Sequence, residues 1–397
     1  MVLHLPLFCV SYDYNFRKGK ANRFVFADRF MVKVKEIINY APKSKIKAGD
    51  AVSNGKYMFF TSSVDENKRY SEYQIDGEGI IMGTGGNATL HYYNGKFSTS
   101  TDCIVLQTNE NVRCKYLYYF FLANMNVLEA GFKGAGLKHT NKNYIGDISI
   151  KNIPDTNAQD FIIRKLSKIE KIITHFRTQL EKLDLLVKAR FVEMFGDTEY
   201  NTKKFPVYKL SELCTVSSSK RIYQDEQSST GVPFLRISNL VELIETGHLK
   251  NELFISDEKY IELVRSNLVP QKGDILVTSR GTLGKCYIVQ DDDKFYFQDG
   301  MISWLYNLNK AITPLYLALL FNTRNIKTQI DNLQSGSTVA YLSITMLKKL
   351  NIVVPPLTLQ NQFADFVKQV DQSKSILQQE LDKAQMLFDS LMQEYFG

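Results

Sequence analysis

Short runs of glycine, acidic and histidine residues are the places in this chain where bond-making chemistry could occur. Residues 281–286 (GTLGKC) are spaced like part of a phosphate-binding loop, but the run is too short and Cys286 stands where Ser or Thr would hold magnesium. The acidic run 291–293 follows no recognisable nuclease strand and is typical of a solvated hairpin turn. The histidines do not pair at metal-ligand spacing: they are His4, His91, His139, His175 and His248.

Two further motifs look like parts of an enzyme that methylates amino groups. Residues 132–136 (FKGAG) match F-x-G-x-G, a pattern that binds S-adenosylmethionine, and 354–357 (VPPL) partly match a catalytic N-P-P-[YF] pattern. The second motif lacks the Asn that accepts from the target amine and the aromatic ring that stacks on a flipped base. The first is followed by the polar residues 138–142, where a nucleotide-binding fold would begin a helix. We interpret both as structural and predict that the chain is not an enzyme.

Two pairs of polar, glycine-containing loops could instead contact a nucleic acid: 83–87 with 279–285, and 133–142 with 334–341. Glycine lets the backbone approach a ligand, Arg and Lys reach phosphates or guanine, and Asn or Gln can bind adenine. Turn chemistry explains any one loop as well, but recurrence in both halves strengthens the case for DNA. With Lys220 and Arg236, the candidate DNA-binding residues are Gly85, Gly86, Asn87, Lys138, His139, Asn141, Lys142, Ser279, Arg280, Thr282, Lys285, Ser337, Thr338 and Tyr341.

The segment that closes each half of the chain is repeated. Residues 155–196 align with 356–397 without a gap, at an offset of 356 − 155 = 201. Seven aligned pairs are identical: Gln159 and Gln360, Leu180 and Leu381, Lys182 and Lys383, Leu186 and Leu387, Glu193 and Glu394, Phe195 and Phe396, Gly196 and Gly397. These identities mean little alone, and the spacing of the apolar positions in the two copies is what indicates an internal duplication.

Apolar residues in both copies of this segment follow a 4,3,4,3 spacing. A period of 3.5 residues is typical of a long helix that lies along another helix in a left-handed supercoil, and the other copy is the natural partner. The seam is broken by Arg190 in one copy and Lys374 in the other. The predicted helix-pair interface comprises Leu166, Ile169, Ile173, Phe176, Leu180, Leu183, Val187, Val367, Val370, Leu377, Leu381 and Phe388.

Composition limits the class of protein. The chain has 397 residues, enough for two or more domains, and a net charge of +7, which attracts polyanions although a charge run is often only a solvated face. Five cysteines without C-x-x-C spacing argue against a disulfide framework or a structural zinc site and fit a reducing cytoplasm. The apolar run 5–10 is too short for a secretion signal, and no stretch approaches the ~20 apolar residues of a membrane span. We expect a cytoplasmic protein.

The order of elements predicts an α+β fold in which globular domains alternate with long helices. Each half has short β-type runs, an aromatic-rich helical stretch (115–125 or 314–330), a closing strand and a proline before its long helix. Thr156 and Gln159 predict a capping box at the start of the first long helix. The predicted boundaries are an extension at 1–29, domains at 30–154 and 199–355, and long helices at 155–198 and 356–397.

This order of parts resembles the specificity subunit of Type I restriction-modification enzymes over residues 30–397. The residues that carry the resemblance are 189–197 (ARFVEMFGD), 273–277 (GDILV), the run 336–357 with its double proline, and 394–397 (EYFG). It implies two similar target recognition domains and two long helices that pair as an antiparallel coiled coil with pseudo-two-fold symmetry. It also implies a subunit without catalytic activity.

The resemblance further implies that each domain binds half of a split site on double-stranded DNA while the helices set the gap. Two methyltransferase subunits and the restriction or translocase subunits would be the protein partners. These partners, and not this chain, would use S-adenosylmethionine, ATP and magnesium; no membrane is involved. The alternative is a coiled-coil scaffold or adaptor without sequence-specific DNA binding, which would lack salt-dependent affinity for a duplex.

Overall fold

The computed structural model describes residues 31–134, 136, 138–249, 253–334 and 341–397, so the predicted extension at 1–29 lies outside the described residues. Helices and strands both contribute, and the fold is of mixed α and β content. The chain divides into two compact units. Unit 1 consists of the chain up to Ile173 together with Lys383–Gly397, and unit 2 is Thr174–Asp382. No helix of the described residues is long and apolar enough to cross a membrane.

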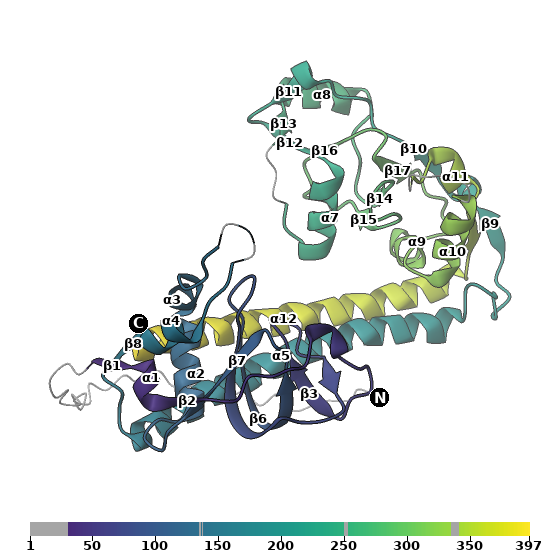
Figure 1. The fold of residues 1–397 in the computed structure, drawn as a ribbon. Helices are drawn as coiled ribbons and strands as arrows, with labels where there is room; N and C mark the ends of the chain where they lie inside the picture. The colour runs from purple at the N-terminus through teal and green to yellow at the C-terminus, as the bar shows by residue number, and fades with distance from the viewer. Residues whose placement is uncertain (1–30, 135, 137, 250–252, 335–340) are drawn as a thin grey trace, which may run out of the picture. The chain divides into compact units, whose positions relative to one another are not determined.

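Unit 1 is built on a six-stranded sheet with the order β2-β7-β5-β6-β3-β4 (Figure 1). The strands are β2 (Ile38–Tyr40), β3 (Tyr57–Phe60), β4 (Arg69–Tyr70), β5 (Ile75–Gly83), β6 (Leu90–Thr99) and β7 (Cys103–Thr108). A separate pair joins β1 (Met31–Lys33) to β8 (Ser149–Lys151). The short helices are α1 (Val34–Ile37), α2 (Cys114–Ala123), α3 (Met125–Glu129) and α4 (Lys142–Asp147), with a 3-10 turn at Ala48–Asp50.

Unit 2 contains two four-stranded sheets, β10-β17-β14-β15 and β11-β13-β12-β16, and the pair β18-β9. The strands are β9 (Val207–Lys209), β10 (Thr215–Ser217), β11 (Gln227–Ser228), β12 (Val232–Leu235), β13 (Phe254–Ile255), β14 (Ile275–Thr278), β15 (Cys286–Ile288), β16 (Tyr296–Phe297), β17 (Ile302–Tyr306) and β18 (Asn351–Val353). The helices are α6 (Leu210–Leu213), α7 (Ile237–Thr246), α8 (Asp257–Arg265), α9 (Pro314–Leu320), α10 (Arg324–Leu333) and α11 (Ile344–Lys348), with a 3-10 turn at Gln224–Glu226.

The duplication extends beyond the long helices into the sheets. β2-β7-β5-β6 in unit 1 and β10-β17-β14-β15 in unit 2 place their strands in the same chain order, and all neighbours in both are antiparallel. The first residues of the short helices α1 and α6 are held in the same way. Val34 N donates to Ile148 O in unit 1, and Leu210 N donates to Leu350 O in unit 2, both at 2.9 Å. The halves diverge outside this shared core: unit 1 adds β3 and β4, whereas unit 2 adds the second sheet with α7 and α8.

A buried glutamine fixes the start of each long helix by the same bonds. The Gln159 side chain accepts from Arg113 N (2.7 Å) and donates to Asn111 O and Pro154 O. Gln360, its aligned partner, accepts from Thr313 N (2.8 Å) and donates to Ala311 O and Pro355 O. Both side chains are almost fully buried, at 0% and 1% exposed, so each replaces water for three backbone groups.

The predicted capping box at Thr156 and Gln159 is wrong. The N-cap is Asp155, whose Oδ1 accepts from Ala158 N at 2.9 Å. Asp is among the preferred N-cap residues, and its carboxylate also suits the positive end of a helix. Gln159 is instead committed to the backbone of the adjoining loop.

The two long helices are α5 (Thr156–Phe195) and α12 (Leu357–Phe396), and they run antiparallel where they meet in each unit. In unit 2, Phe195 of α5 packs on Phe363 of α12, and Asp184 of α5 pairs with Lys374 of α12. The residue number falls along α5 as it rises along α12, so the two helices are antiparallel there. In unit 1, Lys165 Nζ lies 3.2 Å from the Tyr395 hydroxyl. α2 lies between the unit 1 sheet and these helices (Figure 1).

Each long helix ends against the core of the unit that it reaches last. Phe195, at the end of α5, packs on Tyr316 of α9 with ring centroids 4.8 Å apart, and is 1% exposed. Phe396, at the end of α12, packs on Tyr116 of α2 at 5.2 Å. Unit 1 is therefore assembled from two segments that are distant in the sequence, whereas unit 2 is one continuous segment.

The residues predicted to form the helix-pair interface are all wholly or partly buried. The buried ones are Leu166, Ile169, Ile173, Val367, Val370 and Phe388. The half-buried ones are Phe176, Leu180, Leu183, Val187, Leu377 and Leu381. The predicted helical stretch 314–330 is interrupted, because α9 ends at Leu320 and α10 begins at Arg324, with the Thr323 hydroxyl bonded to Leu320 O at 2.6 Å.

Candidate functional site

In unit 2, the loop between β14 and β15 is a tight turn that exposes basic and polar side chains. The Thr278 hydroxyl donates to Thr282 O at 2.5 Å and accepts from Lys285 N at 2.9 Å. Gly281 and Gly284 have φ of +66° and +75°, left-handed conformations that glycine adopts without strain. The turn leaves Arg280 and Thr282 exposed.

The second predicted loop of unit 2 meets this turn. Arg280 and Tyr341 form an antiparallel bridge, and Leu342 N donates to Ser279 O at 2.9 Å. The Arg280 guanidinium lies 5.2 Å from the centroid of the Tyr341 ring, an arrangement that holds the cation in place. No ion pair joins Arg280 to a described residue, so its charge is available to a phosphate or a base edge. Ser337 and Thr338 lie outside the described residues.

Further cations lie where other strands of unit 2 end, beside the same turn. The segment leading into β17 connects these ends: Ser279 N donates to Met301 O, Gly300 N to the Ser218 hydroxyl, and Gln298 N to Leu235 O. The cations that follow the strand ends are Lys220, Arg221 and Arg236. Lys220 pairs with Glu262 at 3.5 Å and Arg221 with Asp299 at 2.9 Å, whereas the exposed Arg236 has no ion pair with a described residue.

Unit 1 has an equivalent loop arrangement. Gly85 and His139 form an antiparallel bridge, Thr140 N donates to Thr84 O at 3.0 Å, and Gly86 N donates to Lys138 O at 3.0 Å. The bond from Thr140 to Thr84 corresponds to the bond from Leu342 to Ser279 in unit 2. In each unit the structure therefore brings together one loop from each of the two predicted pairs.

The unit 1 candidates surround this bridge. Asn87, Lys138, His139, Asn141 and Lys142 are exposed, while Gly85 and Gly86 are half-buried. The Asn141 side chain accepts from Tyr144 N at 3.0 Å and thus caps α4. The Lys142 ammonium lies 4.8 Å from the centroid of the Tyr40 ring. Because it caps α4, Asn141 has a structural role in addition to any contact with DNA.

Besides Lys220, two further candidates in unit 2 are engaged within the protein. Ser279 is 1% exposed and its hydroxyl bonds to that of Ser303 at 2.7 Å, so the prediction that its side chain contacts DNA is wrong. The loop pattern could not distinguish Ser279 from its exposed neighbour Arg280. Ser279 follows the last residue of β14, Thr278, and is still buried. Lys285 forms an ion pair with Glu245 of α7, which compensates its charge.

A basic segment that the candidate DNA-binding residues did not include lies beside the unit 1 loops. Thr101 N donates to Ile46 O at 2.8 Å, and Thr84 N donates to Asp102 O at 2.8 Å, which brings the exposed Lys45 and Lys47 close to the loop that follows β5. The alternation of Lys43, Lys45 and Lys47 was the available signal, since it places all three side chains on the same side of an extended chain.

His91 and three cysteines have structural surroundings. His91 is 4% exposed, with Nδ1 2.9 Å from the Glu66 carboxylate and Nε2 2.9 Å from Ser63 O. Burial raises the pKa of Cys103 to about 11 and those of Cys114 and Cys214 to about 12, which suppresses their thiolates near neutral pH. Within the described ranges no group of His, Cys, Asp and Glu is placed to hold a metal ion.

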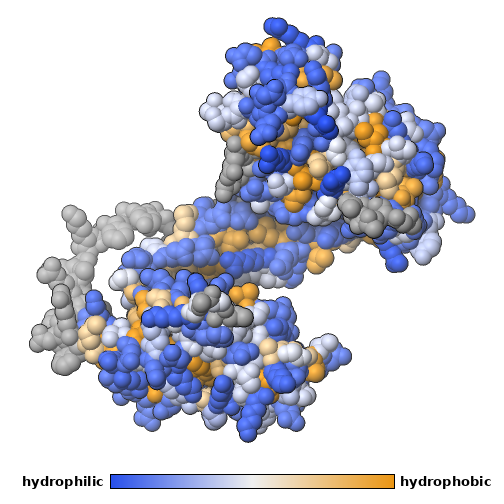
Figure 2. Space-filling model, turned by 45° about the horizontal axis from the view of Figure 1, so that its top comes forward, coloured by the Kyte–Doolittle hydropathy of each residue, from blue (hydrophilic) through white to orange (hydrophobic). Residues whose placement is uncertain are grey.

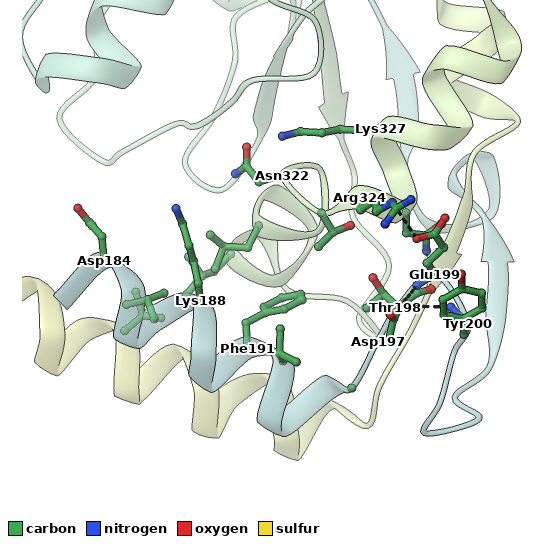
Figure 3. A pocket seen from close by; sticks show the side chains of 18 of the residues that line it. Asp184, Lys188, Phe191, Asp197, Thr198, Glu199, Tyr200, Asn322, Arg324 and Lys327 are labelled. Atoms are coloured by element: carbon green, nitrogen blue, oxygen red, sulfur yellow. Dashed lines mark hydrogen bonds and ion pairs between the residues drawn. The ribbon is translucent and has the colours of Figure 1, made fainter. Parts of the chain in front are cut away.

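A groove of about 910 Å³ lies in unit 2 between the last turns of α5, the turn after it, and the α9–α10 junction (Figure 3). Phe191 and Val192 line its apolar part, while Lys188, Asn322 and Lys327 supply polar groups around it. None of the loop residues above lines this groove. It is therefore a feature separate from the strand-end loops.

The chain matches the family model described as the Type I restriction modification DNA specificity domain over residues 29–184 and 202–386. A Haemophilus influenzae protein described as a type I restriction enzyme specificity subunit is 26% identical over 347 residues, covering 84% of each chain. The type I restriction enzyme MjaVIII specificity subunit of Methanocaldococcus jannaschii is 24% identical over 333 residues, covering 79% of this chain and 76% of its own length. The fold is similar to the crystal structure of a Type I restriction-modification S subunit from M. genitalium, with a TM-score of 0.64, 15% identity, and coverage of 96% and 98%.

Proposed function

The chain belongs to the family of Type I restriction-modification DNA specificity subunits, and from that premise we propose that it binds a bipartite DNA site, one half per loop arrangement. Membership of the family implies recognition of a DNA sequence. The single observation that supports two half-sites is the recurrence of the same paired loops, bridged at Gly85 with His139 and at Arg280 with Tyr341.

The loop arrangements suit DNA on chemical grounds. Arg280 and Arg236 in unit 2, and Lys138 and Lys142 in unit 1, are exposed cations that can bind phosphates or the acceptor edge of guanine. Glycines at 85, 86 and 281 let the backbone come close to the duplex. The two arrangements carry different side chains on the same framework, so the two half-sites should differ in sequence.

The proposed partners are two methyltransferase subunits and the restriction subunits, docked through the long helices. Methyl transfer to adenine and DNA cleavage would be their chemistry, with S-adenosylmethionine, ATP and magnesium. The long helices would set the gap between half-sites, since a helix of 40 residues is about 60 Å long at 1.5 Å per residue.

The experiment that tests this function is a map of methylated adenines in cells that express the chain with its neighbouring methyltransferase. We expect a new split motif with a fixed gap, absent from cells that lack the chain. The variant R280A should relax recognition in one half-motif only, and a variant with both K138A and H139A in the other half only. An unchanged methylation map, with the methyltransferase shown to be active, would instead favour a scaffold without DNA specificity.

A further inference from the structure

The segment that follows the first strand of the duplicated sheet is basic in both units. In unit 1, β2 is followed by residues 43–47, which contain Lys43, Lys45 and Lys47 and which we call the basic segment. In unit 2, β10 is followed by Lys220 and Arg221. Lys43 and Lys220 stand equally far from the ends of their strands, since 43 − 40 = 3 and 220 − 217 = 3. The recurrence of positive charge at this place parallels that of the paired loops.

Hydrogen bonds place the two segments equivalently. In each unit, the amide two positions before β7 or β17 donates to the segment that follows β2 or β10, and the carbonyl one position before β7 or β17 accepts from the loop after β5 or β14. These bonds are Thr101 N to Ile46 O and Thr84 N to Asp102 O in unit 1, both at 2.8 Å, and Gly300 N to the Ser218 hydroxyl at 3.1 Å and Ser279 N to Met301 O at 2.9 Å in unit 2. The basic segment therefore lies beside the unit 1 loops, in the place that Lys220 and Arg221 take in unit 2.

The backbone of the basic segment is fixed, and its lysines are directed away from the core. The Ser44 hydroxyl accepts from Ile46 N at 3.1 Å and from the Gln74 side chain at 2.9 Å. Ser44 is buried and Ile46 is half-buried. The residues that alternate with them are all exposed: Lys43, Lys45 and Lys47. Because this backbone is already ordered, a ligand that binds the lysines would gain affinity from preorganisation.

The charges of the basic segment are not compensated by ion pairs with the described residues. Other cations of unit 1 are compensated, namely Lys33 and Lys35 by Asp147, Lys96 by Asp76, Arg113 by Asp160 and Lys115 by Glu170. The Asp50 carboxylate accepts instead from the backbone N of Lys47, at 2.9 Å. In unit 2, Lys220 pairs with Glu262 and Arg221 with Asp299. The two equivalent segments thus differ in the charge that they can offer to an anion.

We propose that the basic segment binds phosphates of the duplex beside the half-site of unit 1, and that it positions this unit without selecting bases. This inference rests on the proposed function and assigns a separate set of residues to the backbone of the DNA. The lysine ammonium acts as a point charge, and contacts to phosphates fix the register of a protein on a duplex without reading its sequence. On the face that Figure 2 shows, hydrophilic side chains predominate in unit 1, as suits a charged and hydrated interface.

The test measures how the full-length chain, with its methyltransferase subunits, binds a duplex that carries the recognised site at several salt concentrations. The variant K43Q/K45Q/K47Q should reduce the slope of log affinity against log salt concentration by about 2.7, or about 0.9 for each phosphate contact. The matched control R164Q/K168Q/K171Q removes three exposed charges from α5 within unit 1 and should change the slope by less than about 0.9.

A second measurement separates positioning from base selection. The triple lysine variant should weaken binding to the recognised site and to a scrambled duplex by the same factor, and the methylated adenines should keep the same split motif. D102N gives a change of opposite sign, because Asp102 is an exposed carboxylate between the basic segment and the loop after β5. This variant should strengthen binding to both duplexes.

The outcomes distinguish this inference from the proposed function. If the triple lysine variant keeps the wild-type slope, or if the control changes the slope as much, the basic segment does not bind phosphates although the function stands. A relaxed half-motif in the triple lysine variant would show that these lysines select bases, which overturns the positioning role. A wild type that yields no split motif would remove the proposed function and this inference with it. Unchanged melting temperatures would show that each variant remains folded.

Discussion

Gln159 and Gln360 show how one polar residue can determine where an element begins. Each occupies a position that would otherwise leave two carbonyls and one amide without these hydrogen-bond partners. The sequence revealed their equivalence through the alignment of the copies. It could not reveal their bonds, because the partners lie about 50 residues earlier in a loop whose path no local pattern specifies.

We predict that Q360L destabilises the protein by about 3 kcal/mol, since burial of unsatisfied backbone groups costs ~1–3 kcal/mol each. Calorimetric melting measures the effect. The control is Q362L, at an exposed glutamine two residues further along the same helix, which should change stability by less than about 0.5 kcal/mol. Equal melting temperatures for Q360L and the wild type would contradict this role.

Asp274 provides a prediction about pH. Burial raises its pKa above the usual value, although its Oδ2 accepts from both Trp304 Nε1 (2.9 Å) and Gln271 N (2.8 Å). The ionised form is therefore unfavourable in the folded state at neutral pH, and this cost disappears as the pH falls below the ordinary aspartate range. An amide oxygen can accept both bonds without carrying the charge.

We therefore expect D274N to melt at the same or a higher temperature than the wild type at pH 8. Near pH 3.5 the advantage should shrink, because the wild-type carboxyl is then largely protonated. The measurement is the difference between the two melting temperatures at each pH, in which the acid response of the rest of the protein cancels. A variant that is less stable at pH 8 and equal at pH 3.5 would show that the charge is favourable.

Arg280 and Lys285 lie in one loop but differ in charge compensation, which leads to a prediction about salt. R280A should reduce the slope of log affinity against log salt concentration by about 0.9, the value for one phosphate contact. K285A should reduce it less, because Lys285 is paired with Glu245. Titration of a duplex that carries the recognised site, at several salt concentrations, measures both slopes. A larger effect of K285A would reverse this assignment.

At the scale of elements, the long helices were the most predictable part of the chain. Apolar residues recur along their seam at a regular spacing. The predicted first and last residues of the two helices differ from those of α5 and α12 by a few residues at most. The short strands were predicted only as runs, because their order depends on pairings between distant residues, as between β2 and β7. The break between α9 and α10 was missed because 314–330 contains no glycine, and no proline after its first residue.

The seam break at Lys374 gives a prediction about the helix pair. Lys374 takes the place of Ile173 in the other copy and reaches Asp184 on α5, whose side chain is 60% exposed. An exposed ion pair contributes less than about 1 kcal/mol, whereas an apolar side chain at a seam position buries more surface. K374L should therefore raise stability by about 1 kcal/mol in denaturant titration. A loss of stability would mean that the ion pair contributes more than apolar packing at this position.

At the scale of the whole molecule, the duplication makes each unit depend on a helix that starts in the other half of the sequence. F195A removes a fully buried ring from unit 2 and should destabilise that unit by about 3–5 kcal/mol. Hydrogen exchange, which resolves local stability, should speed up in α9 and in the last turns of α5 while unit 1 is unchanged. F396A should have the corresponding effect in unit 1, smaller because Phe396 is only half-buried. If either variant speeds up hydrogen exchange equally in both units, the two units do not unfold independently and this prediction is contradicted.

The placement of Lys383–Gly397 in unit 1 has a consequence for synthesis on the ribosome. The strands and α2 of unit 1 emerge early, but the helical segment with Phe388 and Phe396, which packs on Tyr119 and Tyr116, is translated only after all of unit 2. Residues are added at roughly 5–20 per second, so the apolar surface of α2 waits many seconds for its cover. The first unit to be translated is thus the last to be completed, and nascent chains should need protection by chaperones at α2 during that interval.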